Sequence, residues 1–343
     1  SAASDVYKRQ IFYTSINIPY GSMASAISSD PKDRADLSTW RTIGSTLANM
    51  VIGVATPMVA YVVVDGKTVM SGSRMTIIAG VFSICAILCY IVCFKLTSER
   101  VEVPASNQKI SASAIFKSIF TNKALLGIIV AAIFVLLSQL TVMSLAGYVY
   151  PNVYGSAAAQ STASLLGTVV MLVVCAPFAS KLSAKFGKKE LAMGSSILSA
   201  LVWLVCLIWR PASVWGFVAC YILANIGMGF FNTIIWAMIT DVIDDAEVRN
   251  GVREDGTIYS VYSFARKLGQ AFSSGLVGAL LGIIGYTEAT AFDPAVTRGI
   301  FNMACIAPII GFVCIVLALA FLYPLNKKKV EENVAELAAR RNK

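Results

Sequence analysis

The stretch that decides the fold is residues 257–284, which read TIYSVYSFARKLGQAFSSGLVGALLGII. It is long and apolar enough to cross a bilayer as a helix, yet it carries Lys267 ten residues after its start. At about 1.5 Å per residue, Lys267 lies roughly 15 Å into the span, near the middle of a hydrocarbon core about 30 Å thick. A cation at that depth costs about 2.5–3.5 kcal/mol, so it must face a polar interior and have a partner. The stretch therefore predicts a polytopic membrane protein with a polar path through it, which is typical of proteins that move a solute.

The composition and the hydropathy pattern predict an all-α membrane protein. Of the 343 residues, 57% are hydrophobic and 14% are charged, whereas a soluble domain carries about 25% charged residues. The apolar residues also occur in blocks of bilayer-spanning length. We predict nine spans, at Ile11–Ile27, Leu37–Val64, Met75–Leu96, Ala124–Tyr148, Ala157–Leu182, Leu191–Trp209, Val214–Ile239, Thr257–Ile284 and Gly299–Tyr323.

The basic residues that give the net charge of +9 are distributed among the loops according to side, and this pattern does not predict a nucleic-acid-binding face. When the loops are counted from the first predicted span, alternate loops and the C-terminal tail hold most of the lysines and arginines. The other loops hold only Lys67, Arg74, Arg210 and Arg298. Such a bias marks the cytoplasmic side of a membrane protein. We therefore predict a multi-pass protein of the inner (plasma) membrane with a cytoplasmic C-terminus, whose partner is the lipid bilayer and not nucleic acid.

The chain has eight cysteines and no histidine, which excludes imidazole metal ligands and histidine-based catalysis. Cys85, Cys89 and Cys93 share one helix face, but thiols in apolar helices usually behave as small hydrophobic groups. No H-E-x-x-H motif, serine–base pair or acidic metal cluster occurs at membrane depth. We therefore predict no enzyme activity, no metal site and no cofactor.

The spacing of the predicted spans divides the chain into five parts. Residues 1–10, SAASDVYKRQ, resemble a translated cloning or adapter scar. Residues 11–96 hold three spans, 97–123 form a polar cytoplasmic linker, 124–323 hold six spans, and 324–343 form a charged, solvated tail. Large transporters commonly consist of two repeats around such a linker. The division into three and six spans therefore predicts that the chain is a fragment that lacks three helices at its front.

Three segments, taken together, resemble one transporter family. The first comprises YTSINIPYGS at residues 13–22 and SDPKDRADLSTWR at residues 29–41. The second is WAMITDVIDDAEVRNGVREDG at residues 236–256, and the third is SVYSFARKLG at residues 260–269. Their order and spacing are similar to those of the glycoside–pentoside–hexuronide:cation symporters, the melibiose-carrier branch of the major facilitator superfamily.

The resemblance implies twelve helices in two six-helix bundles, of which this chain would carry family helices four to twelve. It implies that the bundles rock around a central site, so that a glycoside, pentoside or hexuronide moves together with Na⁺ or H⁺. The alternatives are a carrier of the same fold for another organic anion or amphiphile, and a non-transporting sensor or scaffold. The main coupling carboxylates would lie in the first two family helices, so the residues present do not choose between the ions.

The resemblance assigns several residues to the substrate site, and their chemistry suits that assignment. Lys267 can donate to sugar hydroxyls or to a carboxylate, although it could instead only hold two helices together. The planar guanidinium of Arg41 can donate paired hydrogen bonds to hydroxyls or to a carboxylate. The alternative is that the Arg41 side chain extends to the membrane interface. Asn17 can donate and accept but brings no negative charge for Na⁺, and Arg266 points about 100° away from Lys267, which predicts a lateral or interbundle contact. The predicted substrate-binding residues are Lys267, Arg41, Asn17, Tyr20, Asn232 and Trp236, and Lys267 and Asn17 are also assigned to cation coupling.

Two predicted cytoplasmic loops, at equivalent places in the two implied helix bundles, contain both acidic and basic side chains. Such mixtures suit ion pairs that form when the cytoplasmic side closes. The alternative is solvated loop charge, because exposed ion pairs contribute only about 0–1 kcal/mol each. We predict an inside gate formed by Asp30, Asp33, Arg34, Asp241, Asp244, Glu247, Arg249 and Arg253.

Overall fold

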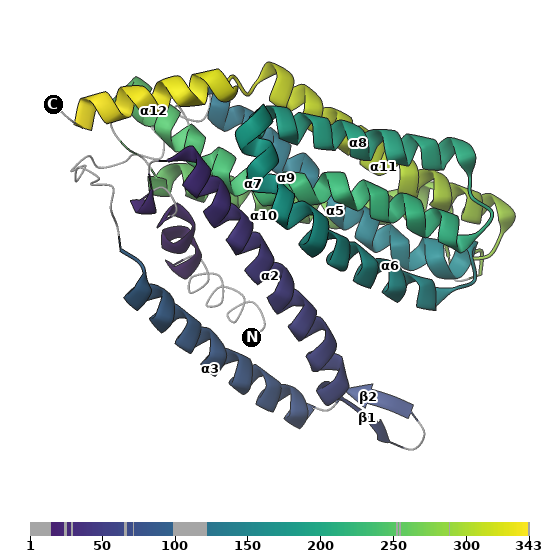
Figure 1. The fold of residues 1–343 in the computed structure, drawn as a ribbon. Coiled ribbons are helices and arrows are strands. Elements are labelled where there is room, and N and C mark those ends of the chain that lie inside the picture. The colour runs from purple at the N-terminus through teal and green to yellow at the C-terminus, as the bar shows by residue number, and fades with distance from the viewer. Residues whose placement is uncertain are drawn as a thin grey trace.

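The computed structural model describes residues 15–23, 26–28, 30–64, 67–70, 72–98, 122–251, 253, 255–287 and 289–341. The predicted scar at residues 1–10 and most of the predicted linker lie outside these residues. Within them, the chain is helical apart from one short hairpin and the connecting turns. Most of the long helices gather into one bundle, while α2 (Pro31–Ala60) and α3 (Gly72–Leu96) lie to one side of it (Figure 1).

The front of the chain contains a hairpin that hydropathy did not predict. Strand β1 (Tyr61–Val64) pairs antiparallel with β2 (Lys67–Met70), and Val64 pairs with Lys67. The predicted span Leu37–Val64 is therefore wrong at its end, because the helix stops at Ala60. A tyrosine followed by three valines favours extended backbone, and the Asp-Gly sequence between the strands is a common hairpin pair.

The remaining helices follow the predicted spans in order. The helix α9 continues from the predicted end at Ile239 to Asn250, and this extension carries the acidic residues of the predicted gate. Single π-helical turns at Val149–Val153 and Met171–Cys175 follow α5 and α6. The helices are α5 (Lys123–Tyr148), α6 (Ala157–Val170), α7 (Ala176–Phe186), α8 (Lys188–Trp209), α9 (Val214–Asn250), α10 (Asp255–Ile283) and α11 (Pro294–Phe321).

Helix packing separates the bundle from the front of the chain. In the bundle, α8 packs against α9 and α11, and α5 packs against α10 and α11. Helix α2 packs against α7 and α9, whereas α3 packs against α2. Among the described residues, α2 therefore joins the front of the chain to the bundle, and the candidate site lies where α2 meets α9 and α10.

Six helical stretches among the described residues are long and apolar enough to cross a membrane, and they include α3, α5, α8, α9 and α11. Helices α2 and α10 have sufficient length but carry more polar residues.

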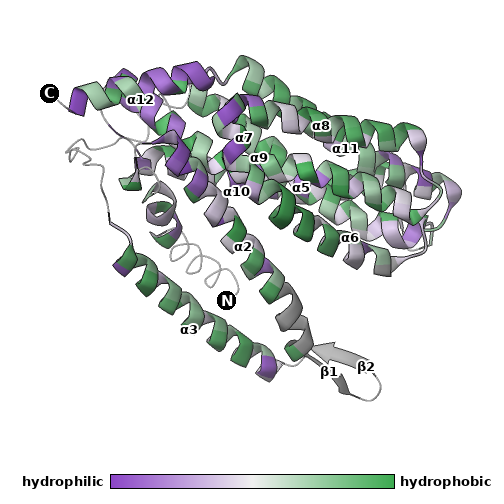
Figure 2. Ribbon diagram, in the orientation of Figure 1, coloured by the Kyte–Doolittle hydropathy of each residue, from purple (hydrophilic) through white to green (hydrophobic). Residues whose placement is uncertain are grey.

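Figure 2 shows hydrophobic residues over most of the bundle and hydrophilic ones concentrated on the C-terminal helix α12 (Lys327–Arg341). Helix α3 buries only Ile78 and exposes apolar side chains such as Ile84 and Phe94. An apolar outer surface suits a lipid environment, where helices satisfy their own backbone hydrogen bonds.

The C-terminal tail is packed, and the prediction of a solvated tail is wrong for part of it. Helix α12 lies against α9, and it buries Asn333 and Leu337. Leu325, just before the helix, is also buried. The cause is an apolar stripe at helical spacing (Val330, Val334, Leu337) that faces the bundle, while most of the charged residues are exposed.

Gly227 on α9 marks the closest approach of α8 and α9. A Cβ atom at this position would collide with the carbonyl oxygen of Ser195 and the hydroxyl of Ser199 on α8. We expect Gly227→Ala to lower the free energy of unfolding by about 1–3 kcal/mol, because the helices would have to separate. Thermal unfolding of the purified protein in detergent measures this loss. The matched control is Gly194→Ala on α8, where a Cβ meets no atom within 4 Å; equal melting temperatures for both variants would contradict the assignment.

Candidate functional site

The start of α2 is shaped to hold Arg34 in place. Asp30 precedes the helix and its carboxylate accepts a hydrogen bond from the backbone N–H of Lys32 at 2.8 Å, as a helix N-cap does. Pro31 occupies the first helical position, which its fixed φ angle suits. The Arg34 Nε then donates to the carbonyl oxygen of Ser28 at 2.7 Å. The Arg34 guanidinium is therefore oriented before it meets the bundle.

Arg34 forms a buried ion pair with Asp244 on α9. Its Nη1 pairs with Asp244 Oδ2, and its Nη2 lies 3.3 Å from Asp244 Oδ1. The side chains are 1% and 4% exposed, so water is excluded from the pair. This contact joins the front of the chain to the bundle, and it unites one residue from each of the two predicted gate loops.

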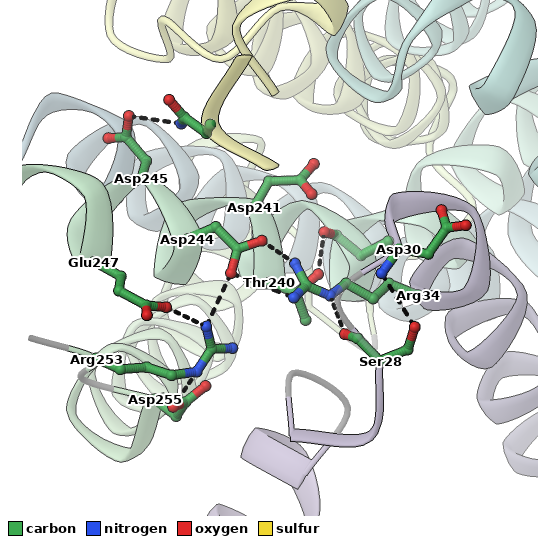
Figure 3. A network of polar contacts seen from close by, with 12 residues as sticks. Ser28, Asp30, Arg34, Thr240, Asp241, Asp244, Asp245, Glu247, Arg253 and Asp255 are labelled. Atoms are coloured by element: carbon green, nitrogen blue, oxygen red, sulfur yellow. Dashed lines mark hydrogen bonds and ion pairs between the residues drawn. The ribbon is translucent and has the colours of Figure 1, made fainter. Parts of the chain in front are cut away.

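Arg253 extends the pair into a charged network, shown in Figure 3. Its Nη1 lies 3.0 Å from Asp244 Oδ1 and 2.6 Å from Glu247 Oε2, and its Nε lies 2.9 Å from Asp255 Oδ2. We call Arg34, Asp244, Glu247, Arg253 and Asp255 the charged network. Burial lowers the pKa of Arg253, but the carboxylates of Asp255, Asp244 and Glu247 raise it by more, so the net pKa is above its usual value. The guanidinium is therefore held in its charged form.

The turn after α9 makes this arrangement possible. Helix α9 ends with Gly251 in the left-handed conformation, at φ 71°, and the Gly251 N–H bonds to the Glu247 carbonyl. A glycine adopts this conformation without the steric cost that a Cβ imposes. The chain reverses there, and Arg253 returns toward Asp244 before α10 begins at Asp255.

The other predicted gate residues lie nearby, but their described contacts do not join the front of the chain to the bundle. Asp241 is buried and pairs with Lys188 of α8 at 2.7 Å. Arg249 pairs with Asp245 along α9 at 2.8 Å. Asp30 and Asp33 are exposed, and Asp33 accepts a hydrogen bond from the Ser28 hydroxyl.

The C-terminal helix α12 contacts the same end of α9. Asn333 donates to the buried Asp245 carboxylate at 3.2 Å. Arg341 lies 3.3 Å from Glu247, a member of the charged network. Arg340 donates to the carbonyl oxygen of Val248 at 3.0 Å. The tail therefore supports the end of α9, including Glu247, one of the carboxylates that hold Arg253.

A second polar contact between α2 and the bundle lies two helical turns along α2 from Arg34. The Arg41 guanidinium carbon lies 3.7 Å from the centre of the Trp236 ring and 4.8 Å from that of Tyr20. Arg41 Nη2 donates to the Tyr259 hydroxyl at 3.0 Å. Trp236 in turn contacts the rings of Tyr259 and Tyr262. We call Tyr20, Trp236, Tyr259 and Tyr262 the aromatic cluster. Together with Arg41, the cluster brings together three of the six predicted substrate residues, namely Arg41, Tyr20 and Trp236.

The other three predicted substrate residues are placed differently. From α10, Arg266 contacts Trp236, with its guanidinium carbon 5.2 Å from the ring centre. Lys267 is exposed near the middle of α10. Asn232 lies one turn before Trp236 and donates to Gln139 at 3.4 Å. Asn17 is half-buried in the helical residues 15–23.

A narrow cavity connects the charged network with the aromatic cluster. Its lining includes Arg34, Arg41, Trp236 and Tyr259, together with Ser38, whose hydroxyl donates to the Thr233 carbonyl. Among the described residues that line it, two are cationic and none is acidic. The cavity lies between α2 on one side and α9 and α10 on the other, so separation of these helices would widen it.

Several residues of the site were not predicted from the sequence. Lys188, Asp245, Asp255 and Arg341 belong to the ion pairs, and Gly21 and Tyr259 belong to the cavity. Asp245 and Asp255 lie inside a segment that carries the family resemblance, residues 236–256, so their charges were a usable signal. Tyr259 had no such signal, because an aromatic residue in an apolar span most often packs in the core.

Comparison with known proteins agrees with this architecture. A family model described as MFS/sugar transport protein matches residues 7–327. The chain is 31% identical over 335 residues to YjmB of Bacillus subtilis, named as an uncharacterized symporter, covering 95% of this chain and 70% of the relative. It is 30% identical over 335 residues to a putative sulfoquinovose importer of Salmonella typhimurium, covering 96% and 69%. It is 28% identical over 338 residues to a glucuronide carrier protein homolog of Escherichia coli, covering 96% and 71%.

The fold is also that of solved transporters. The crystal structure of the Escherichia coli fucose:proton symporter superposes with a TM-score of 0.64 at 13% sequence identity, covering 89% of this chain and 72% of that one. At this identity the likeness concerns the fold alone. The family match, the relatives and the helical architecture lead to one conclusion: the chain belongs to the MFS/sugar transport protein family and is a polytopic membrane transporter, not an enzyme.

Proposed function

We propose that this chain carries sugar acids across the membrane, coupled to Na⁺ or H⁺, by alternating opening of the interface between α2 and the bundle. The observation that carries the proposal is the placement of Arg41. Its guanidinium lies against the rings of Tyr20 and Trp236 at that interface, and among the described residues it forms no ion pair. A cation held in this way is available to an anionic group of a substrate.

The substrate class follows from the charge of the cavity. Arg34 and Arg41 line it, and no acidic side chain does so among its described lining residues. A guanidinium binds a planar carboxylate or a sulfonate through two parallel hydrogen bonds. Three relatives bear names that include such anionic compounds: a glucuronide carrier homolog, a putative sulfoquinovose importer and a putative 2,3-dihydroxypropane-1-sulfonate exporter. A sugar with a carboxylate or sulfonate is therefore the favoured substrate.

A neutral glycoside is the second candidate. The rings of Tyr20 and Trp236 offer apolar faces beside polar groups, an arrangement that suits a pyranose ring. A relative from Lactiplantibacillus pentosus, 26% identical over 338 residues, is named as an isoprimeverose transporter. Comparing a glucuronide with the corresponding glucoside distinguishes the two candidates, since the pair differs only in the carboxylate.

The charged network acts in this proposal as the gate at the cytoplasmic end. Arg34 and Asp244 are buried against each other, so the interface is closed at this end. For the substrate to leave or enter there, α2 must separate from α9 and the pair must break. The placement of this end in the cytoplasm of a multi-pass inner-membrane protein rests on the distribution of lysines and arginines.

Cation coupling is assigned in this proposal to the surroundings of Asn17 and Lys267. The helical residues 15–23 bring Asn17 into the front of the chain, and α10 brings Lys267 from the bundle. The names of two relatives describe symporters or carriers. Both Na⁺ and H⁺ remain as the proposed coupling ions, and the Asn17→Asp variant distinguishes coupling to Na⁺ from coupling to H⁺.

Replacing Arg41 tests the substrate class. Arg41→Lys keeps the positive charge but removes the planar fork, so we expect the dissociation constant for methyl glucuronide to rise about tenfold or more, equivalent to at least about 1.4 kcal/mol. The dissociation constant for methyl glucoside should change less than about twofold. Calorimetric titration of the purified protein measures both. Arg210→Lys is the control, since Arg210 bonds to Asn302 away from the site; unchanged glucuronide binding in Arg41→Lys would refute the proposed anion contact.

Replacing Arg34 tests the gate. Arg34→Ala removes one partner of a buried ion pair, which typically costs about 3–5 kcal/mol, so the interface should open more often. We expect a cysteine introduced at the buried Ala35 to react at least about tenfold faster with a thiol reagent added to inverted membranes. Lys32→Ala is the matched control, because Lys32 is exposed on the same turn. Equal labelling rates in Arg34→Ala and Lys32→Ala would show that the pair does not close this end.

Replacing Asn17 tests its place beside the coupling ion. Asn17→Asp adds a negative charge that attracts Na⁺ or H⁺, so we expect uptake of glucuronide into proteoliposomes to change its dependence on the Na⁺ or pH gradient. A shift confined to Na⁺ indicates Na⁺ coupling, and one confined to pH indicates H⁺ coupling. Identical Na⁺ and pH profiles before and after the substitution would remove Asn17 from the ion site. Asn49→Asp, at an exposed position on α2, is the control.

A further inference from the structure

Tyr259 makes an unusual set of contacts for an aromatic residue in an apolar helix. It is 1% exposed on α10, and its hydroxyl accepts the hydrogen bond from Arg41 at 3.0 Å. Its ring stacks on Trp236, with the ring centres 5.9 Å apart and the planes at 27°. Tyr259 therefore contacts both the cation of the site and the aromatic ring beneath that cation.

Gly21 accommodates the Tyr259 ring. A Cβ atom at position 21 would overlap the Tyr259 ring and its hydroxyl, so the ring occupies the volume that any other side chain at this position would fill. Gly21 is itself buried and lies in the helical residues 15–23. Tyr259 thus extends from α10, in the bundle, into the front of the chain. Its position depends on both sides of the interface.

The contacts of Arg41 explain why this hydroxyl matters. Trp236 at 3.7 Å and Tyr20 at 4.8 Å lie near the guanidinium and restrict its plane. The attraction between the guanidinium and a ring face changes little when the guanidinium rotates within its own plane. A hydrogen bond is directional, so the bond to Tyr259 sets the rotation of the guanidinium. The remaining N–H groups of Arg41 then point in a defined direction.

We propose that Tyr259 is a positioning residue that holds the Arg41 guanidinium in the orientation that binds the anionic group of the substrate, and that Gly21 is required because it admits the Tyr259 ring. This inference rests on the proposed contact between Arg41 and a substrate anion. Tyr259 acts through Arg41 and not by touching the substrate. Its loss therefore weakens the preference for an anionic substrate over its neutral counterpart.

The test uses Tyr259→Phe, which retains the ring, the stacking on Trp236 and the fit against Gly21. We expect the dissociation constant for methyl glucuronide to rise about tenfold or more, as for loss of a hydrogen bond to a charged group. The dissociation constant for methyl glucoside should change less than about twofold. The matched control is Tyr154→Phe, which removes a hydroxyl that bonds to the Pro211 carbonyl at 3.0 Å, distant from the site.

A second measurement separates positioning from direct contact. If Tyr259 acts through Arg41, Tyr259→Phe has no further effect on glucuronide binding in a protein that already carries Arg41→Ala. An additional loss in that background overturns the positioning role, because the hydroxyl must then touch the substrate itself. Gly21→Ala, which displaces the ring but keeps the hydroxyl, should reproduce the loss of preference seen in Tyr259→Phe.

The outcomes distinguish this inference from the proposed function. If the wild-type protein prefers glucuronide and Tyr259→Phe keeps that preference, the positioning role is wrong and the substrate class stands. If the wild-type protein shows no preference, the anionic substrate class is wrong and the positioning role is wrong with it. Loss of preference in Tyr259→Phe and Gly21→Ala, but not in Tyr154→Phe, supports both.

Discussion

The buried ion pair between Arg34 and Asp244 is the interaction on which the closed interface depends. It joins α2 to α9, and therefore the front of the chain to the bundle. Removing two charges from water is costly, and the pair offsets that cost only because Arg253 and the Ser28 carbonyl complete its contacts. When α2 separates from α9, water replaces Asp244 beside Arg34 and Arg34 beside Asp244, while Arg253 and the Ser28 carbonyl keep their own partners. The free-energy difference between closed and open arrangements can therefore stay small, as alternation between two states requires.

Helix α2 links this pair to the candidate substrate site. Arg34, Ser38 and Arg41 follow one another at helical spacing, and each contacts α9 or α10: Arg34 meets Asp244, Ser38 donates to the Thr233 carbonyl, and Arg41 donates to Tyr259. A helix of this length moves as a rigid element. Displacement of α2 therefore alters all three contacts together, which couples the end of the interface to the candidate substrate site without any intermediate loop.

The bundle is held by contacts of a different kind. Between its helices, small residues such as Gly227 permit close approach, and close van der Waals packing replaces the hydrophobic driving force that is absent in lipid. The charged groups concentrate at one end, where α12 supports the last turns of α9 through Asn333 and Arg341. Because the interface with α2 includes the polar contacts of Arg34, Ser38 and Arg41, it can exchange partners with water when it opens, while the bundle keeps its packing.

The sequence by itself determined the membrane class, the order of the helices and most of their bounds, because hydropathy and helical length are local properties of the chain. The mixed charges of two loops also pointed to Arg34 and Asp244, and the family resemblance pointed to Arg41. It misjudged Tyr61–Val64, where β-branched residues are as apolar in a strand as in a span. Only the tertiary structure decided that Asp244 meets Arg34 while Asp241 meets Lys188, and that Arg266 contacts Trp236 while the adjacent Lys267 is exposed. Neighbouring side chains on a helix differ by about 100° in direction, and the packing of other helices selects which of them faces the interface.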